Sequence, residues 1–90
     1  MTARHVFYEG RVQGVGFRYT VRQIAMGYDV AGWVRNLPDG RVELLAAGDA
    51  GEVEPFLKAI DESALAAFIR NQTVTPEPYP TGLRGFEIIH

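Results

Sequence analysis

The feature that most constrains this fold is an abrupt change in the spacing of apolar residues on either side of a glycine-rich run. Residues 5–12 alternate, with Val6 and Tyr8 on one face, as in a strand that buries one side. From Phe17 onward the apolar residues recur at three- and four-residue intervals, as on one face of a helix. Residues 10–16, which contain three glycines, are therefore predicted to form a tight loop between a strand and a helix.

The rest of the chain continues with strand and helix patterns in a simple order. Asp49 stands three residues before Glu52, which is the spacing of a capping box and predicts the start of a second helix. Proline and glycine in the turn Leu37-Pro38-Asp39-Gly40 predict a hairpin. The expected elements are strands over residues 29–36 and 41–47 around that turn, a helix over 50–62, and short strands over 68–75 and 85–89.

This order, β-α-β-β-α-β plus a short terminal strand, predicts the fold class. Right-handed crossovers between strands place both helices on one face of a sheet. We therefore expect an α+β ferredoxin-like sandwich, with an antiparallel sheet and two helices on one face, in a single domain over residues 1–90. Because this fold supports unrelated functions, the function has to be argued from the site.

Composition excludes several classes of function. The chain has no cysteine, which rules out a disulfide framework, a thiolate metal site and a thiol nucleophile. Nine Lys and Arg against eleven Asp and Glu give a net charge of −2, which argues against a nucleic-acid partner. No signal segment or long apolar run is present, so we expect a cytoplasmic protein that does not bind membranes. His5 and His90 lie at opposite ends of the sequence without a pattern of acidic ligands, so both are expected on the surface and no metal site is expected.

The position of Arg18 points to an anion. It falls in the first turn of the helix expected from Phe17, where the helix macrodipole is already positive and a cation is unfavourable by about 0.3 to 1 kcal/mol. An anion held between the loop amides and the guanidinium would offset that cost. The glycines alone would equally suit a plain tight connection. The spacing matches neither the P-loop pattern nor G-x-G-x-x-G, so nucleotide binding is not supported.

Other polar residues have plainer default interpretations. Asn36 alone is typical of a turn. Trp33 is expected to be a partly buried packing residue, and Arg35 to lie on a solvated strand face. The remaining charges are expected on solvated surfaces: Glu9, Glu43 and Glu87 on exposed strand faces, and Arg22 on the outer face of the first helix.

Three segments together resemble a known family. Residues 10–18 (GRVQGVGFR), 32–41 (GWVRNLPDGR) and 85–88 (GFEI) closely resemble the acylphosphatase family in order, spacing and total length. The resemblance implies hydrolysis of the carboxyl-phosphate bond of small acyl phosphates, with release of inorganic phosphate and no cofactor. It also leads us to expect a monomer. Residues 63–80 depart from the family's usual pattern, so the rim of the pocket and the substrate preference stay open.

The resemblance also assigns roles to individual residues. Arg18 resembles the family's phosphate-binding arginine, and Asn36 resembles the asparagine that orients the attacking water. The remaining residues of the implied phosphate cradle are Gln13, Gly14, Val15, Gly16 and Phe17.

Two alternatives from other classes remain to be compared. The first is an anion-binding accessory domain that has the cradle but does not turn over a substrate. The second is an RNA-binding sheet of the same topology, which requires aromatic residues in a set pattern on a central strand. Residues 41–45 (RVELL) lack that pattern and a basic face, so the sequence favours the enzyme.

Overall fold

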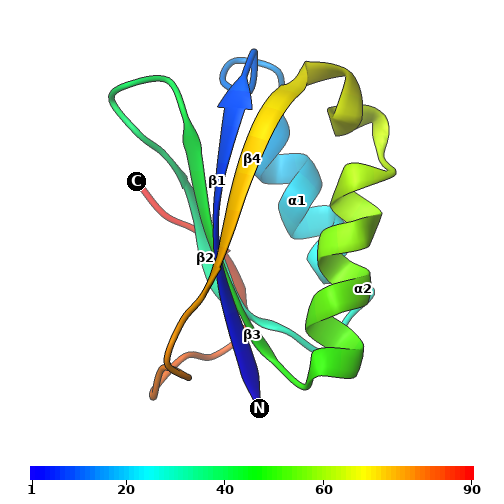
Figure 1. Cartoon of the computed structure of the whole chain (residues 1–90), viewed down its shortest axis with the longest axis vertical. Coiled ribbons are helices and arrows are strands. Elements are labelled where there is room, and N and C mark those ends of the chain that lie inside the picture. The colour runs from blue at the N-terminus through cyan, green and yellow to red at the C-terminus, as the bar shows by residue number, and fades with distance from the viewer.

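The protein, described over all 90 residues by a computed structural model, is a single sheet with helices on one side (Figure 1). Its strands and α-helices follow the expected order, and a short 3-10 helix that was not predicted is added before the fourth strand. The elements are β1 (Thr2–Gly10), α1 (Phe17–Ala25), β2 (Ala31–Asn36), β3 (Val42–Gly48), α2 (Ala50–Asp61), a 3-10 helix (Ala64–Phe68), β4 (Ile69–Pro76) and β5 (Phe86–Ile88).

The sheet has five strands in the order β4-β1-β3-β2-β5, and it is mixed rather than antiparallel. β5 runs parallel to β2, whereas the other neighbouring pairs are antiparallel. The expectation of an antiparallel sheet was therefore wrong for this last strand. β4 ends near the start of β2. Residues 77–85 then cross to the opposite edge of the sheet at this end, so β5 begins beside the start of β2 and runs in the same direction (Figure 1).

Both helices cover the same face of the sheet, as expected for a ferredoxin-like sandwich (Figure 1). α1 buries Phe17 and Val21, and α2 buries Val53, Phe56 and Ile60, against one cluster of 15 buried residues. Burying each large apolar side chain contributes roughly 1.5 to 3 kcal/mol. The period changes in the sequence therefore correspond to the real boundaries between strand and helix.

The start of α2 differs from its expected capping box. Asp49 is the N-cap residue, but its side chain makes no capping hydrogen bond. The Glu52 carboxylate instead accepts a hydrogen bond from the backbone N–H of Asp29, at 2.7 Å. Glu52 thus joins the first turn of α2 to the segment before β2, because a tertiary partner replaces the local one.

One end of the sandwich collects the segments that matter below. The loop from β1 to α1, the β2–β3 turn and the 3-10 helix all lie at the upper end of the view in Figure 1. The chain's C-terminus follows β5 toward the same end (Figure 1). No helix of the structure has the length and apolar character needed to cross a membrane.

Candidate active site

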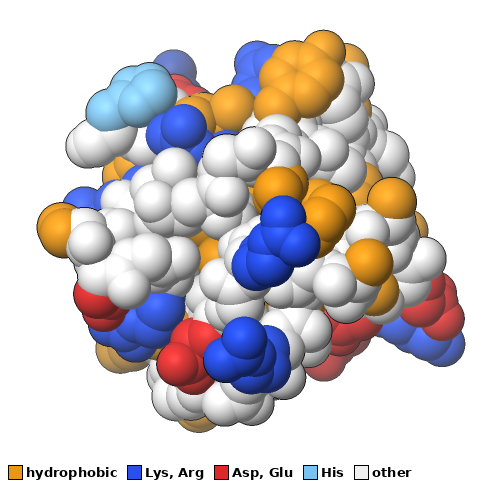
Figure 2. All heavy atoms as spheres, turned by 90° about the horizontal axis from the view of Figure 1, so that it is seen from above, with side chains coloured by type: hydrophobic (Ala, Val, Ile, Leu, Met, Phe, Trp, Pro, Cys, Tyr) orange, Lys and Arg blue, Asp and Glu red, His pale blue; other side chains and the backbone are white.

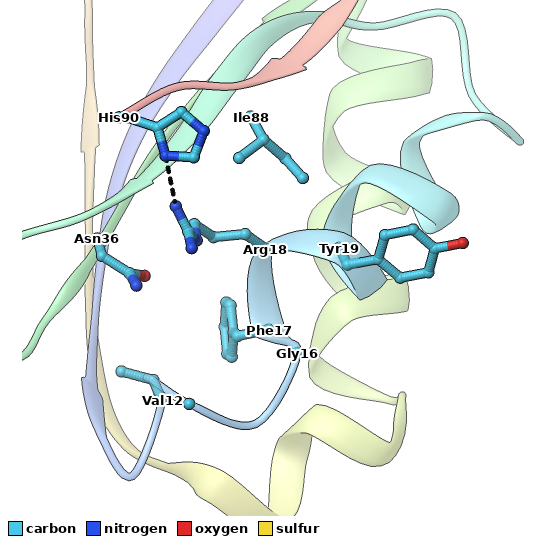
Figure 3. Close-up of a pocket in the computed structure, with 9 residues that line it drawn as sticks. Val12, Gly16, Phe17, Arg18, Tyr19, Asn36, Ile88 and His90 are labelled. Carbon is cyan, nitrogen blue, oxygen red and sulfur yellow. Dashed lines mark hydrogen bonds between the residues drawn. The ribbon is translucent and has the colours of Figure 1, made fainter.

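A hollow of about 370 Å³ lies between the β1–α1 loop, the end of β2 and the C-terminus (Figure 3). Its walls come from parts of the chain that are distant in sequence. The lining residues are Val12, Gly14, Gly16, Phe17, Arg18, Tyr19, Asn36, Ile88 and His90. The structure thus brings Arg18 and Asn36 to one site, as the sequence analysis expected.

Backbone geometry explains the two glycines in the loop. Gly14 and Gly16 have φ values of 77° and 75°, in the left-handed region. A Cβ atom at either position would meet nothing within 4 Å, so backbone conformation and not space requires glycine there. Gly16 is also the N-cap of α1, and no side chain caps this helix. The first amides of α1 therefore have no intrahelical acceptor and no capping side chain, which suits an anion.

The Arg18 side chain points across the hollow, toward the C-terminus and Asn36 (Figure 3). It forms no ion pair with a carboxylate, and α1 has no acidic residue in its first turn. The one hydrogen bond of its guanidinium is a 3.4 Å contact with His90 Nδ1. The positive charge of Arg18 is therefore not compensated within the protein.

Asn36 faces Arg18 from the opposite wall (Figure 3). It is the last residue of β2 and not part of the turn, so its backbone is held by the β2–β3 pairing. Its side-chain oxygen is buried and accepts no hydrogen bond from the protein. Because leaving a buried acceptor unsatisfied costs about 1 to 3 kcal/mol, this amide is suited to a hydrogen-bond donor from outside the chain.

The side chains of two expected cradle residues hold the loop in place and do not line the hollow. The Gln13 amide donates to the backbone carbonyls of Leu37, at 2.8 Å, and Arg41, at 3.0 Å. Val15 is partly buried against the core. Neither residue is part of the lining, so Gln13 and Val15 position the loop through their side chains while Gly14, Gly16 and Phe17 form its inner surface.

One polar residue of the site, His90, belongs to no motif in the sequence. His90 was expected on the surface, and it is exposed, but its ring also lines the hollow beside Arg18 (Figure 3). Its place there depends on β5 running parallel to β2, which carries the C-terminus to the end of the sheet where Asn36 lies. The missed signal was therefore topological and not a motif.

The opposite, helix-free face of the sheet carries a second polar cluster, and it corrects the expectation for Glu43. This residue is only 6% exposed, because side chains from β1 and β2 close over it. Its carboxylate accepts from Arg35 Nε at 2.6 Å and lies 2.6 Å from His5 Nε2, while His5 Nδ1 lies 3.0 Å from Glu77 Oε1. Burial alone would raise the pKa of Glu43, but the hydrogen bonds from Arg35 and His5 outweigh it and hold that pKa below its ordinary value.

Neither cluster has the arrangement of a metal centre. No group of three or more His, Asp or Glu side chains is placed to hold a metal ion.

Fold and site together define a class of small ferredoxin-like domain that presents backbone amides, an arginine and an amide side chain to one hollow. The model of the acylphosphatase family matches residues 4–88. This chain belongs to the acylphosphatase family.

Individual relatives agree over nearly the whole chain. An acylphosphatase from Trichormus variabilis is 48% identical over 84 residues, which are 93% of this chain and 82% of that protein. The crystal structure of acylphosphatase from Bacillus subtilis superposes with a TM-score of 0.90 at 37% identity, covering 100% of both chains. A full-length HypF structure, in its phosphate- and nucleotide-bound form, contains a similar unit, with a TM-score of 0.84 and 27% identity over 99% of this chain and 12% of that one. The two acylphosphatase matches support the enzyme over the accessory domain.

Proposed function

We propose that this acylphosphatase hydrolyses small acyl phosphates in the hollow between Arg18 and Asn36, releasing a carboxylate and inorganic phosphate. The observation that carries the proposal is one pair of unsatisfied groups facing each other. The Arg18 guanidinium has no carboxylate partner, and the buried Asn36 oxygen accepts no hydrogen bond from the protein. A phosphate and a water molecule supply the two missing partners.

Arg18 and the loop hold the phosphate group in this proposal. A guanidinium can bind two phosphate oxygens at once, and amides at the start of α1 can bind a third. Both stabilise the negative charge that spreads over the phosphoryl oxygens during transfer. Because these donors are fixed before the substrate arrives, little reorganisation is needed during the reaction.

Asn36 orients the attacking water. Its oxygen accepts a hydrogen bond from the water and so fixes the line along which the water oxygen approaches phosphorus. The new P–O bond forms as the bond to the acyl oxygen breaks, and that oxygen leaves with the bonding electrons as a carboxylate. The water's proton passes to a phosphate oxygen, and no general acid is needed because a carboxylate is a weak base.

A hydrolysis assay tests this function. We expect acetyl phosphate to be hydrolysed in the presence of a chelator, since protein groups supply every proposed contact to the phosphate. Inorganic phosphate should inhibit competitively, because it occupies the same cradle. Phosphate binding without turnover would instead support the accessory domain, and activity that requires an added divalent ion would contradict the metal-free mechanism.

We further expect the enzyme to act as a monomer in the cytoplasm. Sedimentation of the purified protein tests the first expectation, and fractionation of its native cells tests the second.

A further inference from the structure

A second hollow, of about 380 Å³, lies on the outer side of the β1–α1 loop. It is bounded by the end of β1, the β2–β3 turn and the start of β4, and no apolar residue lines it. None of its lining residues belongs to the first hollow. Its charged residues are Glu9, Arg11, Asp39, Arg41 and Arg70.

An irregularity in the sheet places Arg11 and Arg70 together. The β1–β4 register shifts between Glu9 and Gly10, and the Arg11 N–H donates to Phe68 O at 3.0 Å. Gly10 has a φ of 132°, and a Cβ there would lie 2.3 Å from Phe68 O and 2.8 Å from Arg70 N. With the two backbones this close, both arginines line this hollow and also a smaller one beside it, of about 210 Å³.

The charges of this hollow do not cancel. Arg41 pairs with Asp39 at 2.9 Å, and hydrogen bonds from the backbone and side chain of Arg41 hold the pKa of Asp39 below its ordinary value. Glu9 accepts a hydrogen bond from Asn71 at 3.3 Å. Arg11 and Arg70 form no ion pair and no side-chain hydrogen bond, so the hollow is lined by two arginines without a partner and by one carboxylate, that of Glu9, outside any ion pair. Figure 2 looks onto this end of the molecule and shows Lys and Arg side chains spread over it, some of them with acidic side chains beside them.

We propose that Arg11 and Arg70 form a second anion-binding site, which takes a phosphate monoester or a carboxylate group. Two exposed arginines that line one hollow and have no ion-pair partner leave positive charge there, which a bound anion would neutralise. Their planar forks suit the oxygens of these anions, and the absence of apolar lining disfavours an uncharged ligand. The anion has two possible sources, which are the acyl part of the substrate and a separate small molecule.

Phosphate binding followed by NMR tests the site itself, independently of the enzyme's activity. On titration with inorganic phosphate, we expect the backbone amides of residues 10, 11, 70 and 71 to shift with their own dissociation constant, beside those of residues 14–18. Arg70→Gln and Arg11→Gln should each abolish the first set and keep the second. Arg84→Gln, which removes an exposed arginine elsewhere, should keep both sets. Shifts confined to residues 14–18 in the parent protein would overturn the proposal.

Kinetics then identify the source of the anion, and this arm rests on the proposed function. If the acyl part of the substrate binds here, Arg70→Gln should raise KM for succinyl phosphate about fivefold and leave KM for acetyl phosphate unchanged, since an exposed charge pair contributes up to about 1 kcal/mol. Equal KM values for the two proteins, with the NMR site intact in the parent, would assign the site to a separate phosphate monoester. A protein that hydrolyses neither substrate would refute the proposed function, while the NMR result would still decide the second site.

Discussion

Two arginines, one on each side of the sheet, differ in whether the protein itself provides a carboxylate to pair with them. On the helix-free face, Arg35 pairs with Glu43 at 2.6 Å and its guanidinium carbon lies 5.2 Å from the centre of the Trp33 ring. On the helix-covered face, Arg18 meets only the ring of His90. Arg35 therefore has a carboxylate partner within the protein and stabilises the fold. Arg18 has no such partner and is available to bind an anionic ligand.

The largest expected effect on activity comes from removing Arg18, the arginine without a carboxylate partner. Arg18→Ala should lower kcat/KM roughly 10³-fold, the upper range for deleting one preorganised donor. Arg18→Lys should stay severely impaired, because an ammonium group lacks the two-pronged geometry. Steady-state hydrolysis of acetyl phosphate measures both. Arg22→Ala, exposed on the same helix, is the matched control, and near-normal turnover in Arg18→Lys would mean that another residue holds the phosphate.

Asn36 separates catalysis from binding. Asn36→Ala should lower kcat by about 10²-fold, while inhibition by phosphate hardly changes. Asn36→Asp places a negative charge beside the anion, so phosphate binding should weaken too, and more so at low salt where screening is reduced. Rates and inhibition constants at two ionic strengths check this. An Asn36→Asp enzyme as fast as its parent at neutral pH would show a general base and overturn the water-orienting role.

Giving Arg18 a carboxylate partner should make it resemble Arg35, which is ion-paired within the protein and so less available to a ligand. His90→Glu places a carboxylate next to the guanidinium, and we expect it to raise KM for acetyl phosphate by about tenfold, since pairing with Glu competes with phosphate. His90→Gln keeps a neutral polar side chain and should stay within about twofold of the parent. Equal KM values for the two variants would mean that the chain's C-terminal side chain does not reach Arg18 in solution.

The complementary change removes the Glu43 carboxylate from its cluster with Arg35 and His5. Glu43→Gln should lower the free energy of unfolding by about 1 to 2 kcal/mol, because it leaves Arg35 and His5 without their shared carboxylate. The loss is smaller than for a fully buried ion pair, because water partly screens the exposed Arg35. Urea unfolding measures the loss. The kcat of the folded variant should equal that of the parent, and a fall in kcat without a fall in stability would contradict the division between the two faces.

The smallest effect is the pH dependence of that same carboxylate. The pKa of Glu43 is lower in the folded protein than its ordinary value of 4.5. Its contribution is therefore complete above that ordinary value and is lost as the pH falls through the lower, folded value. The difference in unfolding free energy between parent and Glu43→Gln should therefore shrink as the pH falls from about 5 toward 3. A difference that grew on acidification would reverse the sign of the pKa shift.

Local patterns in the sequence were sufficient for the helices and strands, and the place of Arg18 in the first turn of α1 indicated an anion, whereas Asn36 was singled out only by the resemblance to a family. The change of apolar period at Phe17 placed the loop and α1, and the turn before Gly40 placed the β2–β3 hairpin. These features depend on neighbours in the chain, so they can be read directly from it. The roles of Arg18 and Asn36 stay predictions until the variants are measured.

Long-range packing decided what the sequence did not reveal. Glu43 alternates as an exposed strand residue should, but His5 and Arg35 from neighbouring strands cover it. The parallel course of β5 follows from where residues 77–85 cross the sheet, and no local pattern encodes that crossing. The position of His90 could not be predicted for the same reason, because it follows from the direction of β5.

The way Gln13 holds the loop has a consequence for how this site can change over evolutionary time. Its amide binds two main-chain carbonyls of the hairpin, those of residues 37 and 41, and no side chain there takes part. Substitutions at either position that preserve the turn therefore leave the anchor in place. The rim of the hairpin is free to vary in charge and size, and so to tune which molecules approach, while the geometry of the loop stays fixed.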